Sequence, residues 1–257
     1  MTKTADTVVL VLLPLSAAAA TIAYGADKFI ATTLFFGLPI AYLTIRRPGI
    51  FRKSLIFAFF FSLPLSIFVD TLAVYDGAWY VPHSIAPFRL FGAATLEIYW
   101  FGLLWVLLAV LFYEHLSGQS ISRPFSPAYR WLLALFALLV IIVPVLYLID
   151  AALLAIPYFY LWMSLVFVMP MLVWFLVRYP AFLPRFISAG AYFSFLLLLF
   201  ELTALHQGLW TFPGKHFIGW IELFGYRFPL EEFVFWIIFA TPSLLAYYEY
   251  FADDRKL

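Results

Sequence analysis

The chain is organised around one stretch of ten residues, Arg227-Phe228-Pro229-Leu230-Glu231-Glu232-Phe233-Val234-Phe235-Trp236. In this stretch two adjacent acids open an apolar run that is long enough to cross a lipid bilayer. Ionisable groups at the head of a membrane helix cost free energy, so their presence indicates a pairing partner or a function. The rest of the sequence repeats this arrangement once and surrounds it with apolar and aromatic residues.

The composition is that of an integral membrane protein. Of the 257 residues, 66% are hydrophobic and 11% are charged, whereas a soluble domain averages about 45–50% apolar and about 25% charged residues. The net charge of +1 provides no basic face for nucleic acid. Cys is absent, the four His residues have no ligand spacing, and no glycine-rich nucleotide motif occurs. We therefore expect no disulfide, no metal and no cofactor.

Eight stretches are long and apolar enough to be transmembrane helices. They are residues 7–24, 29–45, 54–72, 95–115, 130–148, 157–177, 186–205 and 229–251. The first stretch looks superficially like a signal peptide, but a second span follows it at once, so we interpret it as a retained helix. The fold class expected is therefore all-α, with about eight transmembrane helices.

The distribution of Lys and Arg predicts the orientation. With eight spans, 11 of the 15 basic residues fall on the side of the N-terminus, and Lys28, Arg89, Lys215 and Arg227 fall on the other side. Basic residues accumulate on the cytoplasmic side of membrane proteins. We therefore expect both termini in the cytoplasm, with the protein in the cell membrane of a prokaryote.

The sequence contains an internal repeat. At an offset of 131, the pattern Asp-x-x-Ala-x-x-x-Gly-x-Trp-x-x-Pro of residues 70–82 recurs at 201–213 with Glu in place of Asp. Leu-Phe-Gly at 90–92 recurs at 223–225, Leu-Glu at 96–97 recurs at 230–231, and Tyr-Glu at 113–114 recurs at 248–249. We predict two four-helix repeats, residues 1–118 and 119–257. Because each holds an even number of spans, the two are parallel, related by an axis along the membrane normal.

Five acids fall inside or at the head of the expected spans: Asp70, Glu97, Glu201, Glu231 and Glu232. All five lie at a similar depth, near the non-cytoplasmic side, so the repeat predicts one carboxylate cluster. Successive helix positions point about 100° apart, so only one of the two adjacent glutamates can face the cluster directly. Crowded, desolvated carboxylates share protons, which provides a proton donor beside a proton acceptor. The alternative is structural, with the acids capping helices or pairing with Arg89, Lys215 and Arg227.

Aromatic residues surround these acids in the sequence. Those expected to bind a substrate are Trp79, Trp100, Trp210, Phe235, Trp236 and His206. His206 lies one turn beyond Glu201 and is placed to orient its carboxylate. Aromatic faces stabilise cations by roughly 0.5–2 kcal/mol each. An interfacial aromatic belt, with His206 as an interfacial residue, would produce the same pattern.

An acid beside aromatic residues in an apolar chamber suits one chemistry. The acid protonates an alkene, the chamber holds the carbocation away from water, and a carboxylate removes a different proton. A prenyltransferase is disfavoured, because there is no Asp-rich motif to hold Mg²⁺ and a diphosphate.

The segment Pro229-Leu230-Glu231-Glu232 resembles the Pro-x-Glu-Glu signature of the membrane lycopene cyclase domain family, which occurs as two small subunits or as fused proteins. The Trp-containing loop before the motif and the tandem halves fit the same family. The motif carries over to Pro229, Glu231 and Glu232 only, because residues 94–98 of the first half have no proline and one acid.

The resemblance implies a cofactor-independent lycopene β-cyclase. Such an enzyme converts the acyclic ψ-ends of lycopene to β-ionone rings by acid–base catalysis, giving β- or γ-carotene. The partners implied are a carotenoid or polyprenoid substrate, the lipid bilayer and other carotenoid-pathway enzymes. Two alternatives stay open: a related polyprenoid cyclase or carotenoid hydratase, and a proton-coupled transporter of lipids or small molecules. Against transport, no polar stripe runs through the spans.

Overall fold

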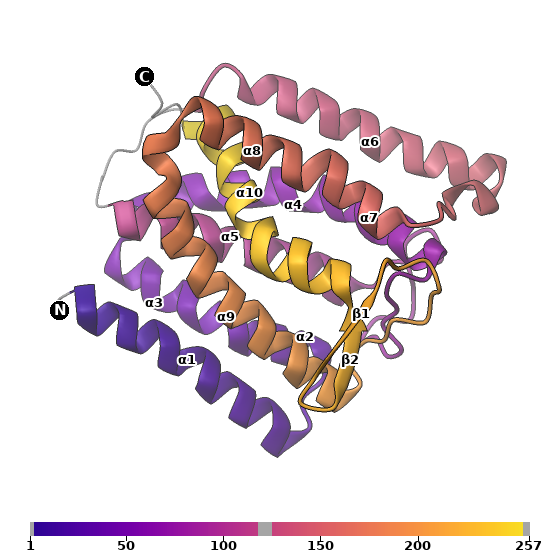
Figure 1. Cartoon of the computed structure of the whole chain (residues 1–257), viewed down its shortest axis with the longest axis horizontal. Helices are drawn as coiled ribbons and strands as arrows, with labels where there is room; N and C mark the ends of the chain where they lie inside the picture. The colour runs from indigo at the N-terminus through magenta and orange to yellow at the C-terminus, as the bar shows by residue number, and fades with distance from the viewer. Residues whose placement is uncertain (1–2, 118–124, 254–257) are drawn as a thin grey trace.

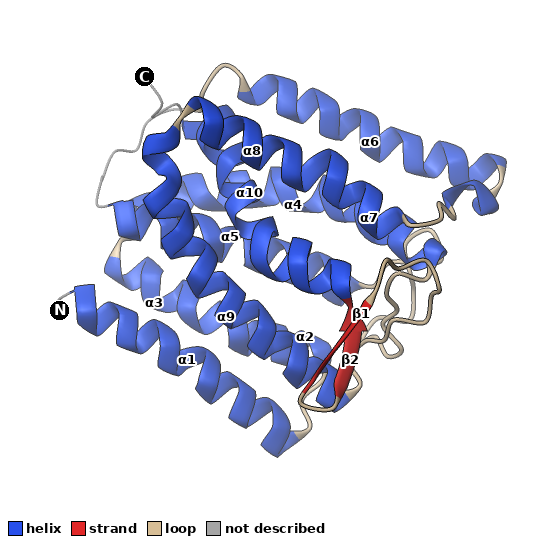
Figure 2. Cartoon of the chain, viewed as in Figure 1, coloured by secondary structure: helices blue, strands red, loops and turns tan. Residues whose placement is uncertain are grey.

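The computed structural model of the chain describes residues 3–117 and 125–253. In these ranges almost every residue outside one set of loops is helical (Figure 2). The elements in chain order are α1 (Lys3–Tyr24), α2 (Lys28–Thr32), η1 (Thr33–Gly37), α3 (Leu38–Arg46), α4 (Pro48–Asp76), α5 (Leu96–Ser117), α6 (Tyr129–Ile149), η2 (Ala151–Leu154), α7 (Phe159–Met163), η3 (Ser164–Val168), α8 (Met169–Arg178), η4 (Pro180–Phe182), α9 (Leu183–Gln207), β1 (Trp220–Leu223), β2 (Tyr226–Pro229), η5 (Glu232–Phe239), α10 (Ala240–Tyr247) and η6 (Tyr248–Asp253).

Consecutive elements join into long helical rods. Among the described residues, seven rods are long and apolar enough to cross a membrane: Ala5–Tyr24, Lys28–Arg46, Pro48–Asp76, Leu96–Leu116, Tyr129–Ile149, Phe159–Arg178 and Pro180–Gln207. An eighth stretch, residues 230–253, is helical throughout, with η5 and η6 π-helical on either side of α10. The protein is thus an all-α membrane protein, and the expected spans each correspond to one rod.

The rods lie side by side in one bundle (Figure 1). The rod of η5, α10 and η6 runs through the middle, α1 lies at one edge and α6 at the opposite edge. α5 is the most buried of the seven spans, and its apolar residues cover all sides of the helix, as expected for a rod enclosed by other helices. The outer rods α1 and α6 present exposed Leu, Ile, Val and Trp side chains, which suit a lipid surface.

Features at matching offsets agree with the two predicted repeats. The π-helical segments η1 and η3 begin 131 residues apart, as do the left-handed glycines Gly77 and Gly208 that end α4 and α9. Tyr80 and Thr211, also 131 apart, exchange two backbone hydrogen bonds of 2.8 and 2.9 Å. The division of the chain at residue 118 stays a prediction, because residues 118–124 lie outside the described ranges.

At the other end of the bundle, two side-chain hydrogen bonds also connect the two halves. The Tyr113 hydroxyl donates to Glu249 at 2.6 Å, and the Tyr248 hydroxyl donates to Glu114 at 2.7 Å. All four side chains are buried. A hydrogen bond to a buried carboxylate is stronger than one between neutral groups. These two bonds therefore tie α5 to the last rod.

A short β-hairpin precedes the last rod and was not predicted from the sequence. β1 and β2 pair antiparallel, and Phe224 and Gly225 form the two-residue turn with φ of 52° and 81°. Positive φ at both turn residues is the geometry that matches the twist of a hairpin. Pro229 was expected to be the first residue of the helix. It is instead the last residue of β2, and the helix begins at Leu230.

The loops after α4 and α9 pack against each other through glycine. Gly77 has φ of 76°, and the Gly214 N–H donates to its carbonyl at 2.8 Å. A Cβ on Gly214 would lie 2.7 Å from that carbonyl oxygen and 3.0 Å from the carbonyl of Asp76. The two loops can approach this closely because residue 214 has no side chain.

We expect Gly214→Ala to lower the free energy of unfolding by about 1–3 kcal/mol, because the added methyl group overpacks against backbone atoms that cannot rotate away. Thermal unfolding in detergent micelles would measure the loss. Gly49→Ala is the matched control, because a Cβ there meets no atom within 4 Å. Equal stability of the two variants would contradict the close packing of these loops.

Candidate active site

A chamber lies where the two halves meet, at the loop end of the bundle. Its empty volume is about 760 Å³, and both halves contribute to its walls. Three acids and one lysine supply its charged groups, namely Asp70, Glu201, Glu232 and Lys28. The other lining residues are apolar or aromatic, and they include Trp79, Phe101, Trp105, Tyr160, Trp210 and Trp236. A largely apolar cavity with a few converging polar groups is the usual form of a binding site.

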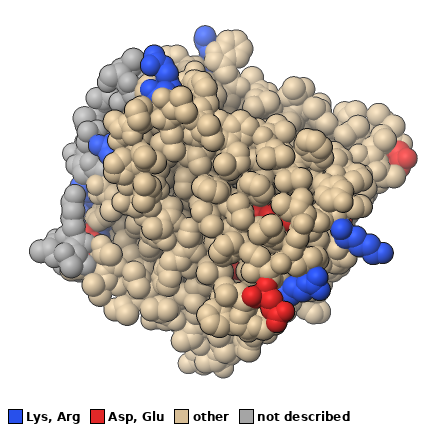
Figure 3. All heavy atoms as spheres, viewed as in Figure 1, with Lys and Arg blue, Asp and Glu red and all other residues tan. Residues whose placement is uncertain are grey.

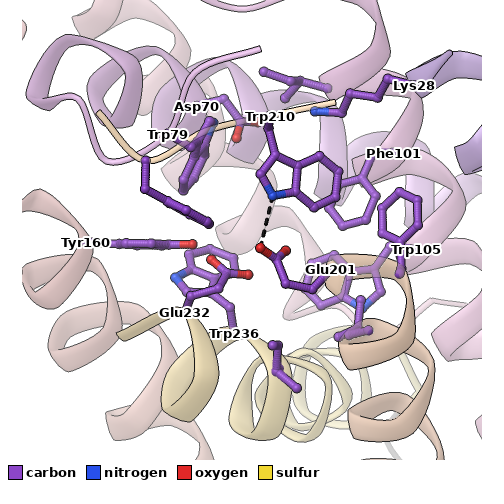
Figure 4. A pocket seen from close by; sticks show the side chains of 15 residues that line it. Lys28, Asp70, Trp79, Phe101, Trp105, Tyr160, Glu201, Trp210, Glu232 and Trp236 are labelled. Carbon is purple, nitrogen blue, oxygen red and sulfur yellow. Dashed lines mark hydrogen bonds between the residues drawn. The ribbon is translucent and has the colours of Figure 1, made fainter. Parts of the chain in front are cut away.

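Glu232 is the first residue of η5 and points into the chamber (Figure 4). In the π-helix, Trp236 and Ile237 follow it one turn later and line the same wall. Among the described residues no donor forms a hydrogen bond or ion pair with its carboxyl group. π-helical turns of this kind occur frequently at functional sites. Glu232 is therefore the acid that is free to act on a bound molecule.

Glu201, on α9, lies opposite Glu232, and the two carboxyl groups face the same space (Figure 4). The Trp210 indole N–H donates to Glu201 at 3.0 Å. Glu201 is buried, and this bond holds one carboxylate oxygen in place. Asp70, its counterpart at an offset of 131, reaches the chamber from α4.

Lys28 is buried in the chamber wall with 7% of its surface exposed. Its Nζ lies over the ring of Trp210, 4.9 Å from the centroid, a cation–π contact. Within the described ranges no carboxylate oxygen lies within ion-pair distance of it, although its charge interacts with Asp70 and Glu201. A cation at the first position of a helix opposes the helix dipole. Its burial there indicates that the neighbouring acids offset its charge.

Glu97 and Glu231 lie outside the chamber, bound to the loops that precede their helices. Glu97 accepts hydrogen bonds from the backbone N–H of Ile85 and from Ser84 Oγ, the latter at 2.9 Å. Glu231 accepts from the backbone N–H of Ile218 at 2.6 Å. The single cluster of five acids expected from the sequence is therefore wrong in this respect. Two equivalent acids, one in each half, anchor the loops, and three face the chamber.

The expected substrate-binding residues separate in the same way. Trp79, Trp210 and Trp236 line the chamber. Trp100 instead stacks on Phe29 and donates to Thr33, away from the chamber wall. Phe235 is not among the lining residues, because η5 turns it away from Glu232.

His206 does not orient Glu201. It is exposed at the end of α9, and its Nδ1 pairs with the Tyr226 hydroxyl at 2.7 Å. The basic residues proposed as partners of the acids also bind elsewhere. Arg89 donates to the carbonyls of Val81, Pro82 and Ala93, and Arg227 lies over the ring of Trp220.

Sequence reasoning missed Lys28, Phe101, Trp105 and Tyr160. Lys28 precedes an apolar run, so it was counted as a flanking loop residue that reaches the interface. Phe101 and Trp105 follow Glu97 at intervals of four, and this helical spacing was the available signal. Tyr160 sits at the head of the sixth span, where nothing in the sequence distinguishes it from an interfacial tyrosine.

Charged side chains on the face shown in Figure 3 gather near its two ends, and acidic atoms are visible in a hollow near the middle. Across the described part of the chain, no group of three or more His, Asp or Glu residues is placed to hold a metal ion. The chamber can bind an apolar molecule, donate a proton from one acid and accept a proton at another.

Comparison with known proteins gives no match to any family model, curated protein or solved structure. The chamber, its acids and the resemblance of the motif are therefore the basis of the functional proposal.

The division of the acids into loop-bound and chamber-facing groups predicts effects of different size on stability. We expect Glu97→Ala and Glu231→Ala to lower the free energy of unfolding by about 1–3 kcal/mol each, because each leaves a loop N–H without its acceptor. Glu232→Ala removes no hydrogen bond and should change it by less than about 0.5 kcal/mol. Thermal unfolding in detergent would compare the three variants. A Glu232→Ala variant less stable than the other two would contradict this assignment.

Proposed function

We propose that the protein is a cofactor-independent cyclase of a linear polyene, of the lycopene β-cyclase type. The observation that carries the proposal is the chamber in which an unpartnered acid, Glu232, faces a hydrogen-bonded acid, Glu201, among aromatic side chains. The resemblance of residues 229–232 to the lycopene cyclase signature supplies the substrate class.

Glu232 is the proton donor in this proposal. No cation and no hydrogen-bond donor among the described residues stabilises its charged form, and an apolar site favours the neutral carboxylic acid. The neutral acid protonates the terminal double bond of the ψ-end. The electrons of an internal double bond then form the carbon–carbon bond that closes the six-membered ring, which leaves a cation on the ring.

Glu201 and Asp70 are the candidate proton acceptors. Both interact with the charge of Lys28, and Glu201 also receives the Trp210 hydrogen bond. These interactions favour the carboxylate form of Glu201 and Asp70 relative to Glu232, which has neither. One of them removes a proton from the ring carbon next to the cation, and a new double bond forms. The reaction is an isomerisation without net oxidation, and the proton returned to the protein replaces the one that Glu232 gave.

The charges of the chamber suit a cationic intermediate. With Glu232 neutral, Lys28 positive and two carboxylates, the net charge of the chamber is −1. The faces of Trp79, Tyr160 and Trp236 cluster on one wall, with ring centroids 5.1 to 6.3 Å apart. Aromatic faces stabilise a cation without reacting with it. The apolar wall also limits the water that would convert the cation to an alcohol.

The orientation proposed places the chamber near the non-cytoplasmic side. The start of α1 and the end of the last rod lie at the same end of the bundle, opposite the hairpin (Figure 1). That end carries most of the Lys and Arg residues, so we assign it to the cytoplasm of a prokaryote.

Expression in a bacterial host that accumulates lycopene tests the function. The expected result is conversion of lycopene to β- or γ-carotene, measured by chromatography of extracted pigments. Unchanged lycopene in cells that contain the membrane-inserted protein would reject the proposal. A hydroxylated product would show that the protein hydrates the substrate and does not cyclise it.

Glu232→Gln should lower the rate of cyclisation by at least about 100-fold, because Gln cannot donate a proton of comparable acidity. Glu231→Gln is the matched control, adjacent in sequence and equally conservative. It keeps an oxygen that can accept from Ile218, so we expect a rate within about tenfold of the wild type, since only a loop contact weakens. Similar losses in both variants would refute the distinct role of Glu232.

Lys28→Met should lower the rate by at least about tenfold, with little change in substrate affinity, because the carboxylates lose the charge that favours their ionised form. Lys28→Arg keeps that charge and should retain more activity than Lys28→Met. Turnover and apparent KM in lipid nanodiscs would separate the two effects. A change confined to KM would instead assign Lys28 to binding.

A further inference from the structure

Two smaller cavities continue from the chamber into the middle of the bundle. The nearer one has an empty volume of about 380 Å³ and shares Asp70, Phe101, Trp105 and Trp236 with the chamber. The other lining side chains come mainly from α4 and α5. Because four lining residues are common to both cavities, the two spaces adjoin each other.

The farther cavity has an empty volume of about 420 Å³ and lies between α4, α6, η3 and α10. Leu65, Trp105 and Trp236 line this cavity and the nearer one. Trp105 and Trp236 therefore stand at the junction of all three spaces. We name the nearer and the farther cavity together the channel.

The channel walls are mainly apolar, with Asp70, Ser62 and Ser66 at the end near the chamber and Ser243 and Tyr247 in the farther cavity. The Tyr247 hydroxyl, one of the few polar groups on them, donates to the carbonyl of Phe167 at 3.0 Å and is satisfied within the protein. The Trp105 indole N–H likewise donates to Thr241 at 3.0 Å. Walls in which apolar side chains predominate and most polar groups are satisfied within the protein favour a hydrocarbon over a polar ligand.

One indole N–H in the channel has no acceptor. Trp236 Nε1 is buried at the junction without a hydrogen-bond partner among the described residues. Buried donors are usually paired, so an unpaired one in a cavity wall indicates a missing neighbour. The π electrons of a polyene can accept a weak hydrogen bond from such a group.

The far end of the channel lies beneath α6. Phe136 of α6 lines it opposite Phe167 and Val168 of η3. α6 packs mainly on α4, and in the described ranges it makes no comparably extensive contact with α7, η3 or α8. The far end of the channel therefore lies against α6, one of the two outer rods of the bundle (Figure 1).

We propose that the channel binds the unreacted tail of the same linear polyene whose end lies at Glu232. The choice of occupant rests on the proposed function, because a chamber that takes the end of a long apolar chain must leave room for the rest. The channel adjoins the chamber, is lined mainly by apolar side chains, and reaches α6, one of the outer rods of the bundle. It makes binding depend on chain length, and it places Leu65 and Val168 as residues that determine specificity.

The test compares a long and a short hydrocarbon with the same kind of terminus, lycopene and farnesene. Leu65→Trp and Val168→Phe each fill the channel from a different wall, and neither residue lines the chamber. Leu138→Trp is the matched control, because Leu138 is 54% exposed on α6 and outside the channel. Each purified variant in detergent micelles is equilibrated with either hydrocarbon, and the bound amount is measured by chromatography.

We expect both channel variants to bind lycopene about tenfold more weakly, through the loss of buried apolar contact, while farnesene binding stays within about twofold of the wild type. The control should bind both hydrocarbons as the wild type does. Equal losses for the two hydrocarbons, or unchanged lycopene binding in both channel variants, would overturn the channel. So would a wild-type protein that does not bind lycopene.

Cyclisation measured on the same preparations distinguishes the two proposals. Selective loss of lycopene binding without cyclised product in the wild type would reject the proposed function and support the channel. Normal cyclisation of lycopene by both filled variants would reject the channel and support the proposed function.

Discussion

The main constraint on the structure is the burial of charged groups in a low-dielectric interior. One lysine and three acids line a cavity inside an apolar bundle, and few hydrogen bonds compensate them. A buried charge is tolerated only where another charge or a set of donors offsets it. Lys28 and the acids of α4 and α9 therefore have to be held near one another, although they come from distant parts of the chain. The interlocked loops after α4 and α9 do this, because they join the two halves directly above the chamber.

The two halves are similar in scaffold and different in chemistry. Asp70 and Glu201 occupy equivalent positions, and so do the loop-binding acids Glu97 and Glu231. The position equivalent to Glu232 in the first half is Ile98, at the offset that relates Glu97 to Glu231. The position equivalent to Lys28 in the second half is Phe159, at the offset that relates Asp70 to Glu201. Within the described residues, the chamber that holds the three acids draws its lining from both predicted repeats. Two carboxyl groups in such a chamber can serve as acid and as base, because different surroundings favour different protonation states.

The sequence predicted the membrane fold well, because bilayer thickness sets the length of each apolar run. It also indicated that only one of the adjacent glutamates could face a common site, since helical geometry separates neighbouring side chains. It did not indicate which one, because that depends on where the loop carrying Ile218 folds back. The burial of Lys28 was equally hidden, since a lysine at the head of a span can reach either water or a cavity. The separation of Trp100 from Trp79 and Trp210 likewise depends on tertiary packing, as aromatic residues at one depth share the same sequence pattern.

The chamber and the channel place different demands on the substrate. The chamber contains the reactive groups, but its contacts with a small apolar end are few and non-directional. Hydrocarbon ends offer no hydrogen bonds, so the end must be positioned by shape and by the rest of the molecule. Contacts with a remote part of a substrate can provide the free energy that orients the reacting part. An apolar channel that adjoins the acids at Trp105 and Trp236 would use the tail in this way. Trp105 and Trp236 would then limit how far the reacting end of the substrate can move relative to Glu232. Binding of the tail in the channel and proton transfer in the chamber would therefore both depend on the wall that these two tryptophans form.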